Sequence, residues 1–96
     1  MRNSIKDNKW NLVSGGVPFE PNIHGYFLTI NHYMVEVLRV EIGIWEAFFY
    51  DNKTMVRKQE IRQLGIEIKG VYSNLSTAKK DAKKVLKEII NKKAGK

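Results

Sequence analysis

The sequence predicts an α+β domain in which an antiparallel sheet of three to five strands is covered by one C-terminal amphipathic helix. Between residues 25 and 70, short segments rich in β-branched and aromatic residues alternate with turn-forming residues, which is typical of strands. After residue 74, apolar residues recur at helical spacing along one face. A single apolar stripe needs a sheet to pack against, and 96 residues suit a single domain, 1–96, with one core.

The N-terminal part gives the weakest pattern. Residues 1–9 are polar, and we expect them to be frayed. The segment WNLVS, from Trp10, predicts a short strand that ends at Gly15-Gly16, and the following GGVPFEPN is expected to be an irregular connection because it contains two prolines. Over residues 10–72 as a whole we expect mostly strands and turns.

Three strands are predicted in the middle of the chain: GYFLTI (25–30), YMVEVLRV (33–40) and IWEAFFY (44–50). Asn31-His32 is expected to be the first turn between them, and Asp51–Thr54 has the residue types of another turn. The segment TMVRKQEIRQ (54–63) fits either a further strand or a loose helical turn. IEIKG (66–70) predicts a last short strand with Ile66 and Ile68 on one side.

The C-terminal helix is predicted over residues 74–92. Its apolar stripe consists of Leu75, Ala78, Ala82, Val85, Leu86 and Ile89. Ser73 or Asn74 can cap its start, with Thr77 at the third helical position of an Asn74 cap. Lysines in the last turn and Gly95 suit its negative end.

The positive charge of the chain is concentrated on this helix. The formal net charge is +7, and residues 75–96 contribute +6 of it through eight lysines against Asp81 and Glu88. Five lysines avoid the apolar stripe and are expected to point to solvent: Lys79, Lys80, Lys83, Lys84 and Lys87. They form either a phosphate-binding surface or only the solvated back of a helix, in a chain with 13 lysines and 4 arginines.

The aromatic residues of the sheet region are expected mainly in the core between sheet and helix. They are Tyr33, Trp45, Phe48, Phe49, Tyr50 and Tyr72. Any exposed ring should lie on the face opposite the helix, where an aromatic side chain can stack on a nucleic-acid base.

Nothing in the sequence specifies a reaction, a metal or a cofactor. The absence of cysteine excludes disulfides and thiolate metal sites. His24 and His32 have no partners at metal-ligand spacing and are interpreted as turn residues, and the carboxylates are scattered without a paired motif. We therefore expect a protein that is not an enzyme. With no apolar leader or membrane-length apolar run, we expect it in the cytoplasm, without a membrane partner.

Residues 43–82 carry a pattern of glycine, aromatic and small residues. Gly43, Trp45 and Ala47 are followed by GVYSNLSTA from Gly70 to Ala78, and then by Ala82. This pattern resembles the AP2-type domain, the three-stranded sheet plus helix of plant transcription factors and of the N-terminus of some phage integrases. The segment between Trp45 and Gly70 is longer than in that family and has room for an added strand.

The resemblance implies DNA binding by the sheet. The candidate side chains for it are Arg39, Trp45, Arg57, Lys58, Arg62 and Lys69. The AP2-type sheet is rich in arginine, whereas the strand at 33–40 has only Arg39, with Glu36 and Glu41 nearby. The capped helix start followed by AKKDAKK is also similar to the final helix of double-stranded-RNA-binding domains, which places lysines on phosphates.

Three functions follow as hypotheses. The first is a non-catalytic nucleic-acid-binding domain, for DNA or RNA, of phage or mobile-element type, which contacts phosphates through the lysines of the helix. The second is a small phage-type inhibitor of a host defence or nucleic-acid enzyme, similar in size and style to anti-CRISPR proteins, which acts by binding a host protein. The third is a structural module that forms a homodimer through an unpaired sheet edge at GYFLTI.

Overall fold

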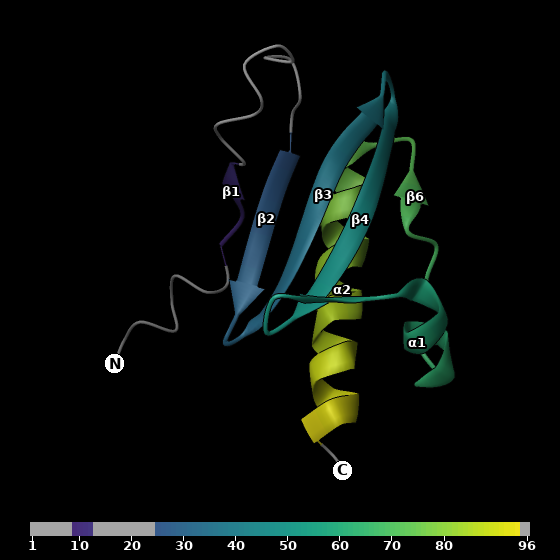
Figure 1. Cartoon of the computed structure of the whole chain (residues 1–96). Helices are drawn as coiled ribbons and strands as arrows, with labels where there is room; N and C mark the ends of the chain where they lie inside the picture. Colours follow the sequence, from purple (N-terminus) through teal and green to yellow (C-terminus); the bar gives the residue numbers. More distant parts are fainter. Residues whose placement is uncertain (1–8, 13–24, 95–96) are drawn as a thin grey trace.

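One antiparallel sheet and one long helix dominate the structure (Figure 1). The computed structural model describes residues 9–12 and 25–94. The elements in chain order are β1 (Asn11–Leu12), β2 (Gly25–Ile30), β3 (Tyr33–Glu41), β4 (Ile44–Asp51), β5 (Thr54–Val56), α1 (Lys58–Gln63), β6 (Val71–Tyr72) and α2 (Leu75–Ala94). The predicted α+β architecture, an antiparallel sheet covered by a C-terminal helix, is confirmed.

Strands β1 to β5 lie in the sheet in their sequence order, and each pairs antiparallel with the next. The far edge of β4 is shared by two short strands. β5 pairs with its C-terminal end, where Phe49 lies opposite Val56, and β6 pairs with its N-terminal end, where Trp45 lies opposite Tyr72. The chain between β5 and β6 contains α1, which Figure 1 shows beside this edge of the sheet.

The predicted turns are confirmed, and their backbone explains their residue types. Asn31 has a φ of 58°, and Asn52 and Lys53 have φ values of 53° and 72°. Two successive residues with positive φ, as at Asn52 and Lys53, are what a type I′ hairpin turn requires, and the turn at Asn31-His32 has one such residue, Asn31. Asparagine tolerates this region better than most residues, which accounts for its place in both turns.

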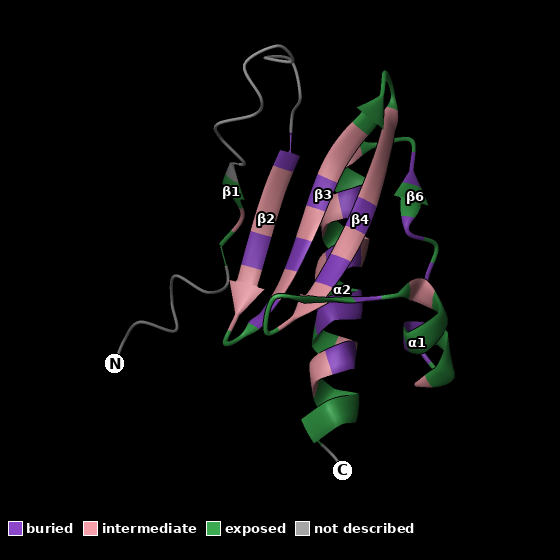
Figure 2. Ribbon diagram, viewed as in Figure 1, coloured by how far each residue is buried: buried purple, intermediate pink, exposed green. Residues whose placement is uncertain are grey.

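Helix α2 covers one face of the sheet and closes the core. In Figure 2 buried segments recur at intervals along β2, β3 and β4, and α2 lies behind them. Alternate residues of the strands point toward the helix, as the strand period requires. The residues exposed by 2% or less are Leu28, Val35, Val37, Ala47, Phe49, Ile61, Ala78, Ala82, Val85, Leu86 and Ile89. The predicted apolar stripe of the helix is thus confirmed as its core face, with Leu75 only partly buried at its start.

The other face of the sheet is turned toward the viewer in Figures 1 and 2, away from α2. Its residues alternate with the buried row and are half-buried: Phe27, Met34, Glu36, Leu38, Ile44, Glu46, Phe48 and Tyr50. We call this surface the open face. Its two carboxylates both have partners, because the Tyr50 hydroxyl donates to Glu36 at 3.1 Å and the Lys58 ammonium lies 3.0 Å from Glu46.

Two predicted segments differ in the structure. Residues 54–63 form both alternatives in succession, the strand β5 and then the helix α1. The strand predicted at IEIKG is wrong: pairing with β4 begins only at Gly70, whose carbonyl accepts a hydrogen bond from the Ala47 amide at 2.8 Å. Gly65 and Gly70, with φ values of 84° and 82°, redirect the chain before and after this segment. Ile66 and Ile68 are nevertheless both buried, as their shared side predicted.

At the chain ends the agreement is partial. Of the predicted strand WNLVS, the structure shows Asn11–Leu12 as strand, whereas Trp10 precedes it. Residues 13–24, with the rest of that segment and the connection, lie outside the described residues, as do residues 1–8 of the segment expected to be frayed. Helix α2 runs two residues further than predicted, to Ala94. The Thr77 amide donates to the side-chain oxygen of Asn74 at 3.1 Å, which confirms Asn74 as the cap.

Candidate nucleic-acid interface

Five lysines follow one another along α2 outside its core face. We call Lys79, Lys80, Lys83, Lys84 and Lys87 the lysine face. Residues four apart lie above one another on a helix, so these five form two adjacent rows, one of three lysines and one of two. From the first to the last, the rows extend about 12 Å along the axis. Lys80, Lys84 and Lys87 are exposed, whereas Lys79 and Lys83 are half-buried.

The lysine face has no acidic partner in residues 9–12 and 25–94. The lysines that do form ion pairs lie elsewhere: Lys58 binds Glu46 at 3.0 Å, and Lys93 binds Asp51 at 2.7 Å. Asp51 also lies 3.1 Å from the imidazole of His32. Hydrogen bonding to Asp51 raises the pKa of Lys93, which therefore stays charged in its pair. The face thus presents several ammonium groups that nothing in the described chain neutralises.

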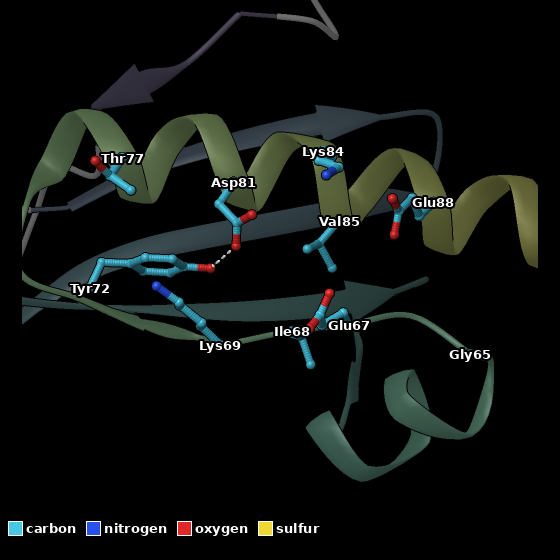
Figure 3. Close-up of a pocket in the computed structure, with 10 residues that line it drawn as sticks. All are labelled: Gly65, Glu67, Ile68, Lys69, Tyr72, Thr77, Asp81, Lys84, Val85 and Glu88. Atoms are coloured by element: carbon cyan, nitrogen blue, oxygen red, sulfur yellow. Dashed lines mark hydrogen bonds between the residues drawn. The ribbon is translucent and has the colours of Figure 1, made fainter.

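The two acidic residues of α2 lie on a different side from the lysine face. Asp81 and Glu88 are seven residues apart, two helical turns, and both point toward the segment that connects α1 to β6 (Figure 3). They line a surface pocket of about 590 Å³ together with Glu67, Lys69, Tyr72 and Lys84. Lys84 marks the border at which the pocket meets the lysine face.

Tyr72 fixes the position of Asp81. Its hydroxyl donates a hydrogen bond to the Asp81 carboxylate, and the Gly70 amide donates to the same hydroxyl oxygen at 3.4 Å (Figure 3). Burial raises the pKa of Tyr72, and the bond to Asp81 raises the same pKa further. The phenol therefore stays protonated as a donor. The carboxylate is directed toward β6 and forms no ion pair with the lysine face, of which Lys84 alone shares the pocket among the described residues.

Lys79 was expected to point to solvent, but it is half-buried, with its ammonium beside two aromatic rings. Its ammonium lies 3.8 Å from the ring centre of Tyr26 and 5.9 Å from that of Trp10. A cation is attracted to the face of an aromatic ring, and the lysine stem is apolar enough to lie along the sheet. The contact was missed because Trp10 and Tyr26 are far from the helix in sequence, and no local pattern joins them to it.

The candidates proposed for the sheet do not share one surface. Arg39 and Trp45 are cross-strand neighbours in the row that faces α2, and Trp45 packs against the core. Lys58 reaches toward the opposite side, to Glu46 of the open face. Arg57 and Arg62 are exposed at either end of α1, and Lys69 lines the pocket beside Tyr72. The sheet therefore offers no continuous basic surface among the described residues, unlike α2.

The aromatic residues are distributed as expected. Tyr33, Phe49 and Tyr72 are buried, and Trp45 packs against the core. Phe48 and Tyr50 lie on the open face, opposite the helix. That face carries two carboxylates, Glu36 and Glu46, and the described cation beside it, Lys58, is already paired with Glu46. It is therefore a poor surface for phosphates.

The described histidine, His32, is exposed in a turn, as interpreted from the sequence, and His24 lies outside the described residues. No group of three metal-ligating side chains occurs in the described ranges. Neither described helix has the length and apolar character needed to cross a bilayer.

Comparison with known proteins gives no relative: no family model matches the chain, and no curated protein or solved structure matches it significantly. The resemblance to the AP2-type domain therefore stays a prediction. In the residues that carry it, Gly43 has a φ of 77° in the turn between β3 and β4, and Trp45 lies opposite Tyr72.

Proposed function

We propose that the protein is a non-catalytic nucleic-acid-binding domain that holds phosphates on the lysine face of α2. The observation that supports this most directly is the segregation of charge on that helix. Its acidic residues face the pocket beside β6, and Asp81 is held there by Tyr72, whereas the lysines on its outer side have no ion-pair partner among the described residues. If the charges of this helix served only solubility, acidic and basic residues mixed on the same side would stabilise the helix through pairs three or four residues apart.

The chemistry of such a face is electrostatic. Lysine ammonium groups are mobile point charges, so they bind phosphates without the fixed geometry that reads bases. With four or five phosphate contacts, counterion release predicts that affinity for a duplex falls roughly 100- to 500-fold when the salt concentration rises fourfold. We therefore expect binding with little sequence preference and a steep dependence on salt.

The test is a binding titration by fluorescence anisotropy against duplex DNA, single-stranded DNA and RNA at several salt concentrations. The variant Lys84→Glu/Lys87→Glu replaces two positive charges of the lysine face with negative ones. The matched control, Lys53→Glu/Lys92→Glu, changes the net charge equally at exposed sites outside it. We expect the first variant to bind far more weakly, with a salt slope lower by about two, and the control to stay close to the parent. Equal losses in both variants would mean that net charge alone attracts the nucleic acid, and the proposal would fail.

A second function, inhibition of a host protein, is favoured by the open face. Met55 and Val71 belong to strands along the same edge of β4, and each is 48% exposed, beside the half-buried Phe48 and Tyr50. An apolar surface of this kind suits a protein partner better than a phosphate chain. A partner captured from nuclease-treated host lysate should be lost with Met55→Asp/Val71→Asp and kept with Lys84→Glu/Lys87→Glu. The reverse pattern would place the partner, or a nucleic acid that carries it, on α2.

A further inference from the structure

Beside the lysine face lies a small aromatic cluster formed by three separate parts of the chain. Trp10 precedes β1, Tyr26 belongs to β2, and Lys79 comes from the second turn of α2. Strand pairing brings the first two together, because Leu12 lies opposite Tyr26 in the sheet. All three side chains are half-buried, so each keeps part of its surface in contact with solvent.

We infer that this cluster is a base-stacking site, and that the nucleic acid bound along α2 is single-stranded. The inference rests on the proposed function, because it takes the lysine face as the path of the phosphates. It adds the form of the nucleic acid and the residue that meets a base, Trp10.

The distances assign different roles to the two rings. The Lys79 ammonium lies 3.8 Å from the centre of the Tyr26 ring, so this ring already has a cation on its face and positions Lys79. The same ammonium is 5.9 Å from the centre of the Trp10 ring, which leaves Trp10 as the ring for a base. A phosphate held by Lys79 would therefore place the base of the same nucleotide within reach of Trp10.

The lysines that follow Lys79 define the path of the nucleic-acid strand along the helix. Lys83 and Lys87 follow Lys79 at intervals of one helical turn, so the next phosphates can proceed along the row away from Trp10. A base in a duplex is paired and stacked on its neighbours, whereas a base in a single strand is free to stack on a side chain. A lysine row that ends at an aromatic ring is the combination found where single strands are bound without sequence preference.

The test separates bases from phosphates. Oligo(dT) and an abasic deoxyribose-phosphate strand of the same length carry the same phosphates, but only the first has bases. We expect the protein to bind oligo(dT) at least about 5-fold more tightly than the abasic strand, since one stacked base contributes at least that much. Oligo(U) in parallel shows whether the ribose changes the affinity while the dependence on bases remains.

Trp10 also serves as the reporter. The chain has two tryptophans, so a Trp45→Phe background leaves Trp10 as the only one, and all comparisons are made within that background. Oligo(dT) should quench the fluorescence of Trp10, and the abasic strand should not. Trp10→Leu keeps an apolar side chain against the core but removes the ring, and should reduce the affinity for oligo(dT) to that for the abasic strand.

The failure of this inference is distinct from failure of the proposed function. If oligo(dT) and the abasic strand bind equally, and both lose affinity with Lys84→Glu/Lys87→Glu, the lysine face binds phosphates but the stacking site is refuted. Unchanged Trp10 fluorescence on saturation with oligo(dT) refutes it as well, without any substitution at Trp10. If no strand binds at low salt, the inference and the proposed function fail together.

Discussion

The hydroxyl of Tyr72, in the last strand, donates a hydrogen bond to the carboxylate of Asp81 in the second turn of α2. Tyr72 is 6% exposed, and its hydroxyl also accepts the Gly70 amide hydrogen bond. One phenol thus joins three parts of the fold: the turn before β6, β6 itself and the helix. It also holds the acidic side of α2 against the sheet edge, which is the charge arrangement that the proposed function requires.

Replacement of Tyr72 by phenylalanine should lower the free energy of unfolding by about 1–2 kcal/mol, because the Gly70 amide and the Asp81 carboxylate both lose a partner. Urea denaturation followed by circular dichroism measures this change. Tyr50→Phe is the matched control, since it removes the hydroxyl bond to Glu36 on the half-exposed open face and should cost less. Equal losses in the two variants would show that the bond to Asp81 has no special weight.

Stability should fall at alkaline pH because of the same residue. Burial and the bond to Asp81 raise the pKa of folded Tyr72 above the value of about 10 that an unfolded tyrosine has. A raised pKa means that the folded state keeps the proton more firmly, so its contribution is complete below pH ~10 and is lost as the pH rises toward the folded pKa. The unfolding free energy of the parent should decline above pH ~10, and that of Tyr72→Phe should decline less steeply. Parallel curves for the two proteins would assign the decline to other groups.

The small residues of α2 set how closely the helix approaches the sheet. Ala82 is 0% exposed, so a larger side chain there must displace the strands or the helix. Ala82→Leu should destabilise the protein by about 1–3 kcal/mol through overpacking. Ala94→Leu introduces the same side chain at an exposed position of the same helix and should have little effect. Thermal denaturation of the two variants measures the difference, and a stable Ala82→Leu would mean that the contact is loosely packed.

Gly43 and Gly70 have similar backbone conformations but different surroundings. Comparing alanine substitutions at the two positions therefore distinguishes backbone strain from a steric clash. Gly43 and Gly70 have φ values of 77° and 82°, and a Cβ at Gly43 would meet no atom within 4 Å. A Cβ at Gly70 would meet the side chain of Lys58, the partner of Glu46. Gly43→Ala should cost about 1–2 kcal/mol from backbone strain alone, and Gly70→Ala should cost slightly more, because the end of the Lys58 side chain must move away from its pair with Glu46.

A double-mutant cycle measures the additional loss of stability in Gly70→Ala relative to Gly43→Ala. In a Lys58→Ala background the clash is absent, so the effect of Gly70→Ala on the free energy of unfolding should approach that of Gly43→Ala. If Gly70→Ala remains equally costly without Lys58, the added loss arises from the Gly70 carbonyl, which accepts the Ala47 amide hydrogen bond.

The sequence was sufficient for the elements whose pattern is local. The strands at 25–30, 33–41 and 44–51 follow from alternation between turn residues, and α2 follows from its stripe and its Asn74 cap. IEIKG shows the limit of this reasoning. Its alternation correctly placed Ile66 and Ile68 in the core, but a strand also needs a neighbour to pair with, and pairing with β4 begins only at Gly70.

For the candidate site, too, the sequence predicted the features that depend on nearby residues and not those that depend on distant ones. The helical period identified the lysine face and the apolar stripe, because both depend on residues a few positions apart. Three relationships depend on contacts between distant segments and have no sequence signal of their own. They are the hydrogen bond of Tyr72 to Asp81, the contacts of Lys79 with Tyr26 and Trp10, and the separation of Arg39 from Lys58 on opposite sides of the sheet.

The order of the strands has a consequence for how the chain folds during synthesis. From β1 to β5 each strand pairs with its neighbour in sequence, so these contacts need only short loop closures. The helix that buries their inner row is synthesised after all of these strands, since α2 begins at Leu75. On the ribosome all the strands are therefore synthesised while Val35, Val37 and Phe49 still lack their cover, and docking of α2 is the step that removes this apolar surface from association with other chains.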